Sequence, residues 1–313
     1  MGKAVFPHAP VREKSCLGCH NPHGSAFRNF VRKERAALCY TCHEGEERQF
    51  QAGTAHFPVA NGECLVCHDP HQSSLAFHLR GNSVEELCAG CHDDLQKGYH
   101  YMHEPVAVGD CIACHNPHAS KNDHLLYAKV NKTCFSCHSI MKEEFDRNYI
   151  HAPASQDCTL CHDPHGAAAA FQLKTRRDAS GRYVAVQQPL KDSCMRCHRQ
   201  SNPELADLEK IAYPHKPAAD GQCTACHAAH ASNFAWLMKA PLQKVCFSCH
   251  RKIKQHISES RYRHGPVQSG ECHQCHDAHG SNFGSLLRSP FDVSFGGNFD
   301  RHTQLLSVKK RKQ

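Results

Sequence analysis

The sequence contains little from which to build an ordinary apolar core. It has a single tryptophan among its 313 residues, and its mean hydropathy is −0.59. Long apolar runs are missing too, so no membrane-spanning helix is expected, and Met1–Pro10 lacks the apolar stretch of a signal peptide. We therefore expect a bound group to supply much of the buried apolar surface, in a mature chain whose export signal is absent.

Cysteine never occurs outside one motif. All 22 cysteines belong to eleven copies of Cys-x-x-Cys-His, which leaves none for a lipid anchor. The cysteine pairs are Cys16 with Cys19, Cys39 with Cys42, Cys64 with Cys67, Cys88 with Cys91, Cys111 with Cys114, Cys134 with Cys137, Cys158 with Cys161, Cys194 with Cys197, Cys223 with Cys226, Cys246 with Cys249, and Cys272 with Cys275. The histidines that complete the motifs are His20, His43, His68, His92, His115, His138, His162, His198, His227, His250 and His276.

The motif predicts covalently bound haem c. Two thiols three residues apart can form thioethers with the vinyl groups of one porphyrin, while the following imidazole binds the iron as proximal ligand. Tetrahedral zinc joins two Cys-x-x-Cys pairs without needing a histidine after each. Redox disulfides and disulfide frameworks need no such histidine either. We therefore predict eleven haem c groups, and an apoprotein that is largely unfolded.

The charge of the polypeptide has to be corrected for haem. Its formal value is +7 at pH 7, which would ordinarily indicate an anionic partner. Each ferric bis-histidine haem contributes about −1, so eleven bring the total to about −4, and full reduction brings it to about −15. The basic excess therefore balances propionates, and no binding to nucleic acid is expected. Residues 309–312 are interpreted as a solvated basic run.

The motifs alternate between two kinds, in a doubled repeat of about 48 residues. In the first kind, called A, a second histidine lies three residues after the proximal one, and a His-x-Pro sequence precedes the first cysteine by seven or eight residues. A motifs begin at Cys16, Cys64, Cys111, Cys158, Cys223 and Cys272. The second kind, called B, has neither feature. B motifs begin at Cys39, Cys88, Cys134, Cys194 and Cys246.

The sixth repeat lacks its B motif. Alignment of the sequence after Ser232 with the sequence after Ser281 places Phe295, Asn298 and Phe299 where the two cysteines and the histidine would stand. We interpret the last B site as a degenerate one that has lost its haem.

Regular secondary structure is expected to be short. The sequence pattern predicts helices over 139–149 and 204–211, and proline disfavours helix in the residue before it, so each His-x-Pro is expected to be extended. The predicted fold is mostly irregular with short α-helices, an array of tandem two-haem repeats organised by covalently bound haems. Its parts are seven haems over 1–165, an insertion loop over 166–190, four haems over 191–299 and a basic tail over 300–313. The insertion is either a docking site or a plain surface loop.

Each iron needs a second axial ligand, which decides whether the haem carries electrons or offers an open site. Methionine cannot serve throughout, since the chain has five and none recurs with the motif. Two recurrent classes of histidine can serve. The His-x-Pro histidines are His8, His56, His103, His151, His215 and His264. The histidines that follow the A motifs are His23, His71, His118, His165, His230 and His279.

We assign the His-x-Pro histidines to their own A haems, because their connection to the motif is long enough to loop over the distal face. A histidine three residues after the proximal one stays on the same side of its haem, and should therefore serve a neighbour. This assigns the next B haems to His23, His71, His118, His165 and His230, and leaves His279 without a haem. The local spacing resembles that of the small class III tetrahaem cytochromes, which implies the same two kinds of ligation.

Six further histidines follow no repeat, and we interpret them as surface residues or as hydrogen-bond partners of propionates. They are His78, His100, His124, His256, His273 and His302. His100 is the most suitable substitute ligand, because it lies close to His103 in the sequence.

Residues 8–299 as a whole resemble the doubled Cys-x-x-Cys-His multihaem cytochromes, which include decahaem proteins that pass electrons through or to an outer-membrane porin. The resemblance implies low-potential bis-histidine haems that relay electrons between periplasmic donors and terminal acceptors. The chain departs from that pattern in its eleven motifs, its insertion and its degenerate last site.

We expect electron transfer rather than catalysis, in the periplasm, at the outer membrane or outside the cell. The expected partners are redox proteins, a porin or other multihaem cytochromes. A first alternative is a subunit of an extracellular cytochrome filament, in which a histidine such as His279 or His8 completes a haem of the next subunit. A second is a reductase of nitrogen or sulfur oxyanions, which would need an open haem, and no Cys-x-x-Cys-Lys motif occurs.

Overall fold

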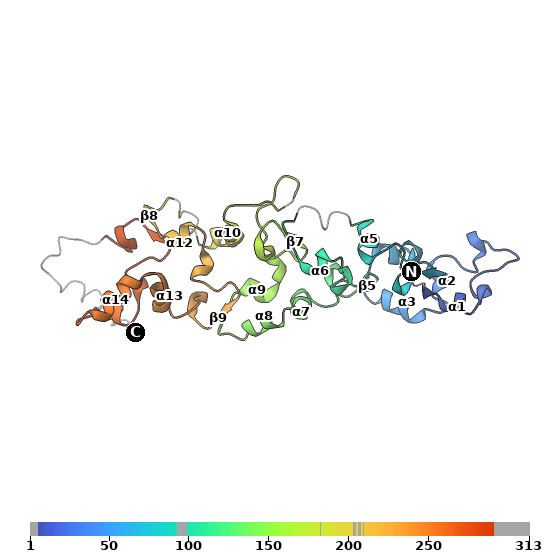
Figure 1. Cartoon of the computed structure of the whole chain (residues 1–313), viewed down its shortest axis with the longest axis horizontal. Coiled ribbons are helices and arrows are strands. Elements are labelled where there is room, and N and C mark those ends of the chain that lie inside the picture. Colours follow the sequence, from blue (N-terminus) through green and yellow to red (C-terminus); the bar gives the residue numbers. More distant parts are fainter. Residues whose placement is uncertain are drawn as a thin grey trace, which may run out of the picture. The chain divides into compact units, whose positions relative to one another are not determined.

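Short elements joined by turns make up the computed structural model, which describes residues 6–92, 99–181, 183–202, 205, 208 and 210–290 (Figure 1). Among these residues the longest helix is α10, Pro189–Ser201, and every strand has two residues. No described helix has both the length and the apolar character needed to cross a bilayer. The chain divides into two units, Met1–Pro189 and Leu190–Gln313. The predicted fold class, mostly irregular with short helices, is confirmed.

Each A motif begins a 3₁₀ turn of three residues. In the first repeat the carbonyl of Cys16 accepts a hydrogen bond from the N–H of His20 at 3.0 Å, which closes one turn of helix over the motif. Residues three apart share one face of such a turn, so both thiols point to the same side. The six turns are η1 (Cys16–Gly18), η3 (Cys64–Val66), η5 (Cys111–Ala113), η7 (Cys158–Leu160), η9 (Cys223–Ala225) and η11 (Cys272–Gln274).

B motifs are placed on α-helices instead. These are α2 (Ala36–Cys39), α5 (Val84–Ala89), α7 (Val130–Phe135), α10 and α13 (Leu242–Cys249). At the start of α5 the Ser83 hydroxyl accepts from the N–H of Glu86, and two glutamates lie in the first turn, where they favour the helix. A second helix follows three B motifs, as α3 (Glu44–Gln51), α8 (Ser139–Glu144) and α14 (Arg251–Glu259). The helix predicted over 139–149 therefore exists but ends at Glu144.

A His-x-Pro histidine marks the start of a short helix before each A motif. His8 is extended, with φ −61° and ψ 142°, and Pro10 lies in the first turn of α1, where its missing N–H costs no helical hydrogen bond. The extended conformation is thus confirmed for the histidine, while the proline belongs to a helix. The helices are α1 (Ala9–Arg12), α4 (Phe57–Ala60), α6 (Glu104–Ala107), α9 (Ala152–Gln156), α12 (Lys216–Ala219) and α15 (Gly265–Gln268).

Strand pairs join one repeat to the next. A strand just before a His-x-Pro pairs antiparallel with the strand that follows the A motif of the next repeat. The pairs are β1 (Phe6–Pro7) with β3 (Gln72–Ser73), β2 (Thr54–Ala55) with β5 (Ala119–Ser120), β4 (Tyr101–Met102) with β7 (Gly166–Ala167), and β8 (Tyr213–Pro214) with β10 (Gly280–Ser281). Two further strands, β6 (Tyr149–Ile150) and β9 (Ala231–Ser232), occupy the same places in their repeats. A repeat is therefore completed by its successor.

In each repeat, a 3₁₀ turn follows the second histidine of the A motif and brings the chain back to the proximal histidine. In the second repeat this turn ends where Leu79 forms an antiparallel bridge with His68. In all six A motifs such a bridge joins the proximal histidine to the residue eleven positions later. The turns are η2 (Arg28–Phe30), η4 (Ala76–His78), η6 (Asp123–Leu125), η8 (Ala170–Gln172), η10 (Ala235–Leu237) and η12 (Gly284–Leu286). We call the segment from the A motif to the end of this turn the A loop.

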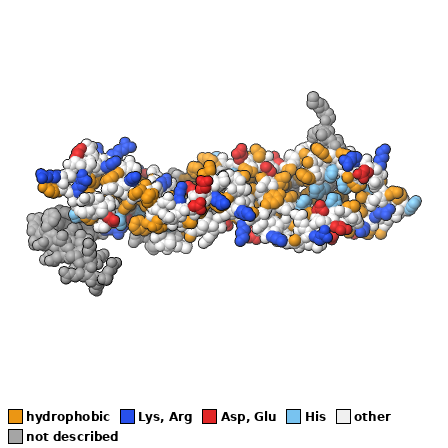
Figure 2. Space-filling view, turned by 90° about the horizontal axis from the view of Figure 1, so that it is seen from below, with side chains coloured by type: hydrophobic (Ala, Val, Ile, Leu, Met, Phe, Trp, Pro, Cys, Tyr) orange, Lys and Arg blue, Asp and Glu red, His pale blue; other side chains and the backbone are white. Residues whose placement is uncertain are grey.

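Few hydrophobic side chains are buried. Those at most 8% exposed among the described residues are Ala119, Ala167, Ala169, Leu208, Ala231 and Met238. Four of these six are alanines, which bury little area each. Large apolar side chains such as Phe77, Phe171 and Trp236 are mostly exposed, and Figure 2 shows hydrophobic side chains spread over the surface among charged ones. The described part of the polypeptide by itself thus lacks a continuous core, as its hydropathy predicts.

The predicted insertion over 166–190 begins as an ordinary A loop, with β7 and η8 in the usual places. Beyond them the Thr175 hydroxyl, in a residue only 2% exposed, donates to the carbonyl of Val184 at 2.7 Å. Arg177 lies 4.2 Å over the ring of Tyr183 and bridges to it through the backbone. The insertion is therefore a closed turn. Half of the residues of the helix predicted over 204–211 lie outside the described residues.

Candidate haem sites

In all six A motifs the A loop fixes the proximal histidine. Its Nδ1 lies 2.7–2.8 Å from the backbone carbonyl oxygen of the residue nine positions later. For His68 this oxygen belongs to Phe77. Because a carbonyl only accepts, Nδ1 carries the proton, and Nε2 is left with the lone pair that can bind iron.

The carbonyl reaches the imidazole because two consecutive residues of the loop are left-handed. In the second repeat these are Phe77 and His78, both with φ of 57°. The Phe77 carbonyl accepts from His68 Nδ1, and the His78 carbonyl accepts from the N–H of Asp69 at 2.7 Å. The other loops have the same conformation at Asn29/Phe30, His124/Leu125, Phe171/Gln172, Trp236/Leu237 and Ser285/Leu286. Such residues are unfavourable by about 1–2 kcal/mol each, so their recurrence indicates that positioning the histidine outweighs the strain.

Replacing Phe77 with valine should loosen the second A loop. The ring is 78% exposed, so its loss matters little, but a β-branched residue tolerates a positive φ poorly. We expect the loop to lose about 1–2 kcal/mol of local stability. The amide of Arg80, which donates to the Cys67 carbonyl at 2.8 Å, should then exchange its hydrogen roughly 5- to 30-fold faster. Phe77→Ala is the matched control, and equal exchange rates in the two variants would contradict the backbone explanation.

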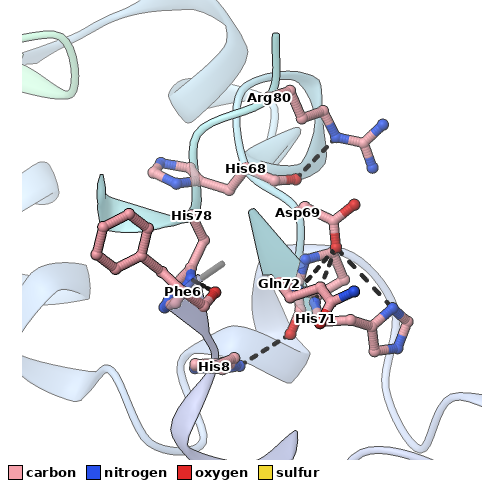
Figure 3. A network of polar contacts seen from close by, with 9 residues as sticks. Phe6, His8, His68, Asp69, His71, Gln72, His78 and Arg80 are labelled. Carbon is pink, nitrogen blue, oxygen red and sulfur yellow. Dashed lines mark hydrogen bonds and ion pairs between the residues drawn. The ribbon is translucent and has the colours of Figure 1, made fainter. Parts of the chain in front are cut away.

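Four His-x-Pro histidines are held where the strand before them pairs with the next repeat, a contact that we call a joint; Figure 3 shows the joint at His8. The N–H of His8 donates to the carbonyl of His71 at 2.9 Å, and His8 Nδ1 lies 3.0 Å from the carbonyl oxygen of Pro70. The same two bonds join His56 to His118 and Pro117, His103 to His165 and Pro164, and His215 to His279 and Ala278. Here too the Nδ1 proton is committed to a carbonyl, so Nε2 is the nitrogen available to a metal.

These imidazoles lie opposite the proximal histidines of the B motifs in their own repeats. The ring centroids of His8 and His43 are 6.2 Å apart, with 16° between the ring planes. The corresponding pairs, at 5.9–6.1 Å, are His56 with His92, His103 with His138, and His215 with His250. This placement corrects the prediction that His8, His56, His103 and His215 lie over their own A haems. The hydrogen bonds to the next repeat decide where these rings point, although the connection is long enough to reach the A motif.

The histidines that follow the A motifs lie opposite the A-type proximal histidine of the preceding repeat. His71 and His20 have ring centroids 6.1 Å apart and planes within 15°. The corresponding pairs, at 5.9–6.1 Å, are His118 with His68, His165 with His115, and His279 with His227. The structure thus differs from the prediction in two ways: His71, His118 and His165 face A motifs rather than B motifs, and His279 has a partner. The antiparallel strand pair turns the chain back toward the previous repeat. The assignments of His151 and His230 stay predictions.

The eight ring pairs have the dimensions expected for two axial ligands of one iron. A metal–nitrogen bond of about 2 Å on each side, with about 1 Å from each nitrogen to its ring centre, separates the centroids by about 6 Å. The observed separations are 5.9–6.2 Å, and one ring of each pair directly follows a Cys-x-x-Cys sequence. The residues present therefore fit a covalently attached haem with two histidine ligands.

Burial keeps several of these imidazoles in the form that binds metal. It lowers the pKa of His118, and it lowers the pKa of His165 against the opposing effect of Asp163. The pKa of His8 is also lowered, mainly by burial, against the effect of its hydrogen bond to the Pro70 carbonyl. Since iron binds neutral imidazole, these shifts favour ligation.

The first cysteines of successive motifs are neighbours. A hydrogen bond between the thiols of Cys39 and Cys64 raises the pKa of Cys39 and lowers that of Cys64 to about 6. In the second unit the hydrogen bond with Cys194 lowers the pKa of Cys223 to about 7. The first cysteine of each B motif thus adjoins the first cysteine of the next A motif, in the pairs Cys39/Cys64, Cys88/Cys111, Cys134/Cys158, Cys194/Cys223 and Cys246/Cys272. Thioether formation would consume these thiols and place the attachment points of successive haems side by side.

The second cysteine of a motif differs in exposure between the two kinds. In the B motifs it is exposed at every site, namely at Cys42, Cys91, Cys137, Cys197 and Cys249. In the first five A motifs it is half-buried, at Cys19, Cys67, Cys114, Cys161 and Cys226, whereas Cys275 of the sixth is exposed. None of these residues forms a disulfide, so each thiol remains available for a thioether. Haem attachment at these eleven cysteines therefore stays a prediction from the motif.

The described residues contain neither a disulfide nor a cluster of the kind that binds zinc. All 22 cysteines are free thiols rather than disulfides. In the part of the chain that the structure describes, no group of three or more His, Cys, Asp or Glu side chains converges as a tetrahedral zinc site requires.

The histidines outside the repeat take other places. His78 Nδ1 lies 3.1 Å from the carbonyl oxygen of Phe6, and its ring is tilted against His8 (Figure 3). His273 has Nε2 3.6 Å from a carboxylate oxygen of Glu271, with its ring edge-on to Trp236. The three others within the described ranges, His100, His124 and His256, are exposed. His302 lies outside the described residues, as do Phe295, Asn298 and Phe299 of the degenerate site.

Three histidines of the repeat pattern have no second imidazole opposite them among the described residues. They are His23, which follows the first A motif, and His264 and His276 of the last repeat. All three are exposed, whereas the proximal histidines of the other five A motifs are half-buried. The pairing rule explains why: the second imidazole of an A site comes from the following repeat, so the first repeat has a ligand to spare and the last A site has none.

Comparison with known proteins agrees with this geometry. No curated protein matches the chain. A family model described as "Doubled CXXCH motif" matches six times, over residues 8–48, 56–97, 103–143, 151–203, 215–255 and 264–292. Each match begins at a His-x-Pro histidine, and together the matches span well over half of the chain. The chain therefore belongs to the doubled CXXCH motif family and is a multihaem c-type cytochrome.

Proposed function

We propose that the chain carries eleven haem c groups and transfers electrons along them, as a carrier or conduit in extracellular or anaerobic respiration. Haem c supplies a one-electron couple whose potential depends on its axial ligands and surroundings. The observation that carries the proposal is the set of eight imidazole pairs 5.9–6.2 Å apart. Paired imidazoles fill both axial positions, which suits electron transfer and leaves no position for a substrate.

The protein connects neighbouring sites in two alternating ways. Within a repeat, the A and B sites share one joint: His8 of the first B site and His71 of the first A site are bonded through their backbones. Between repeats, the thiol contact of Cys39 with Cys64 links the B site to the next A site. Because both links recur in each unit, consecutive sites are held in a fixed sequence over which electrons can pass.

The chemistry of attachment supports the location that we propose, and the resemblance to multihaem cytochromes supports the partners. Covalent haem attachment normally takes place outside the cytoplasm, so we place the protein in the periplasm or at the outer membrane, with the extracellular space as the alternative. Partners are redox proteins, an outer-membrane porin or other multihaem cytochromes. The first and last A motifs have exposed cysteines, Cys16 and Cys275, which leaves their attachment sites accessible to such partners.

The count and the ligation can be tested on protein exported by a host that attaches haem c. Intact-mass spectrometry should give eleven adducts, and electron paramagnetic resonance should show low-spin iron at the sites with paired imidazoles. A Cys88→Ala/Cys91→Ala variant is the matched control and should carry one adduct fewer. Far fewer than eleven adducts, or high-spin iron at many sites, would refute the proposed array.

A further inference from the structure

The two ends of the repeat array present complementary halves of one joint. Inside each unit a joint has two halves, which we name for the histidine ligand that one supplies and not for their hydrogen bonds. The donor half is the strand and histidine after an A motif, and the acceptor half is the strand and His-x-Pro of the preceding repeat. The first repeat has a donor half, residues 21–25, with no acceptor among the described residues. The last repeat has an acceptor half, residues 262–264 with His276, and no described donor.

The donor half is already folded as it is inside the array. Gly24 has φ of +152°, the same value as Gly280 in β10. The Ser25 hydroxyl donates to the Val31 carbonyl, and the N–H of His23 donates to Asn21 Oδ1, as the equivalent groups do in the sixth repeat. The two segments differ only in whether another strand lies beside them. A Cβ on Gly280 would come within 3.0 Å of Pro214, whereas a Cβ on Gly24 would meet nothing within 4 Å.

The acceptor half is preformed as well. His264 is extended, with φ −63° and ψ 136°, and begins α15 as His8 begins α1. His276 Nδ1 is fixed by the Ser285 carbonyl at 2.8 Å, so its Nε2 is free for a metal. Tyr262 is 82% exposed and His264 is exposed, whereas His8, His56, His103 and His215 are half-buried in their joints.

We propose that a second copy of this chain completes the joint head to tail, with its His23 as the second axial ligand of the haem on His276. The inference rests on the proposed haem at that site. The register of the internal joint, Gly280 with Pro214 and Ser281 with Tyr213, places Gly24 of one copy against Arg263 of the other and Ser25 against Tyr262. The N–H of His264 then donates to the carbonyl of His23, as the N–H of His215 does to His279.

Such a contact is heterologous, because a donor half meets an acceptor half and both remain available at the ends of the assembly. Heterologous contacts that do not close produce open chains. The joint would also extend the order of sites across the boundary, since His23 supplies the A site of the preceding copy as His71 supplies that of the first repeat. In the assembly an iron bound to His276 would also be held by His23 of the next copy, whereas at the free end it would have only His276.

His23→Ala should separate this proposal from the alternatives. In the haem-loaded wild type we expect the mass in solution to rise with concentration, while a high-spin signal from one haem fades. In His23→Ala the self-association should weaken at least about tenfold, and the high-spin signal should persist at every concentration. His256→Ala, an exposed histidine outside the repeat pattern, is the matched control. Added imidazole should remove the high-spin signal and dissociate wild-type assemblies without any mutation.

Three results would overturn the proposal. If the wild type stays monomeric with one high-spin haem, the site is simply open, as in an enzyme. If both wild type and His23→Ala are entirely low-spin when dilute, a residue of the same chain fills the position. If self-association persists unchanged in His23→Ala, another surface mediates it. Intact mass distinguishes these outcomes from failure of the proposed function, which would appear as missing haem on every variant.

Discussion

A chain made without haem should fail to fold. We expect its far-ultraviolet circular dichroism to be that of an unfolded polypeptide, with no cooperative thermal transition. The reason lies in the burial: among the residues that the structure describes, the hydrophobic ones at most 8% exposed are four alanines, one leucine and one methionine. At about 25 cal/mol per Å² of apolar area, so few small side chains cannot offset an ordering cost of about 1–2 kcal/mol per residue.

Without haem, the joints alone should not stabilise the folded chain. Each strand pair contributes only two residues per strand, and an isolated two-stranded pair is marginal in water even at greater length. We therefore expect each haem to act as the local core of its repeat, as structural metals do in small domains.

The comparison needs matched samples of one sequence. The apoprotein can be produced in the cytoplasm, where haem is not attached, and the holoprotein by export in a host that attaches haem c. Hydrogen exchange should show protected amides, such as the Arg80 N–H bonded to Cys67, in the holoprotein only. A reversible, cooperative unfolding transition in the apoprotein would contradict this expectation and would mean that the joints suffice.

The sites of haem attachment could be predicted from the sequence because the attachment motif depends only on local spacing. Two thiols and an imidazole within five residues of sequence define a haem c site wherever the backbone lies, so every motif could be identified from the residues. The alternation of A and B motifs could be identified for the same reason. It correctly indicated a doubled repeat and two recurrent classes of second ligand, and the structure places members of both classes opposite proximal histidines.

The motif that each second histidine lies opposite could not be predicted from spacing. The chain between His8 and Cys16 is long enough to reach several positions, and the choice is made by hydrogen bonds to His71 and Pro70, more than sixty residues away. The strands that carry those bonds have two residues each, too short for a periodic pattern. One local signal existed: a serine or alanine follows two residues after the second histidine of each A motif, at Ser25, Ser73, Ser120, Ala167, Ser232 and Ser281.

The left-handed turns of the A loops were hidden for a different reason. In a sequence, a position with positive φ is usually recognised by a glycine or an asparagine. The residues at the first left-handed position of the six loops are Asn29, Phe77, His124, Phe171, Trp236 and Ser285. They share no side-chain chemistry. What they share is a backbone carbonyl that accepts a hydrogen bond from the proximal histidine. Every residue has such a carbonyl, so the residue types do not reveal which ones make this bond.

His8→Ala should convert one haem to high spin, and the haem affected should be the one on Cys39 and Cys42. The His8 ring lies opposite His43, which belongs to that motif. A single variant cannot show which haem changed, because every site contributes similar signals. A second substitution that removes a chosen haem resolves this, since two changes at one site cannot add.

The Cys39→Ala/Cys42→Ala background lacks the first B haem. There, His8→Ala should produce no new high-spin signal, because the iron that loses its ligand is already absent. In the Cys16→Ala/Cys19→Ala background, which lacks the first A haem, the same substitution should produce the full signal of one haem. If His8 instead served its own A motif, as its sequence spacing alone would allow, the two backgrounds would give the reverse result.

His71→Ala supplies the complementary half of the test. Its ring faces His20, so its high-spin signal should vanish in the Cys16→Ala/Cys19→Ala background and survive in the Cys39→Ala/Cys42→Ala background. Because His8 and His71 are bonded to each other through the backbone, damage to their shared joint would affect both sites in every background. Opposite responses of the two variants can therefore arise only if each histidine binds its own iron, and identical responses would show that the joint, rather than ligation, had been disturbed.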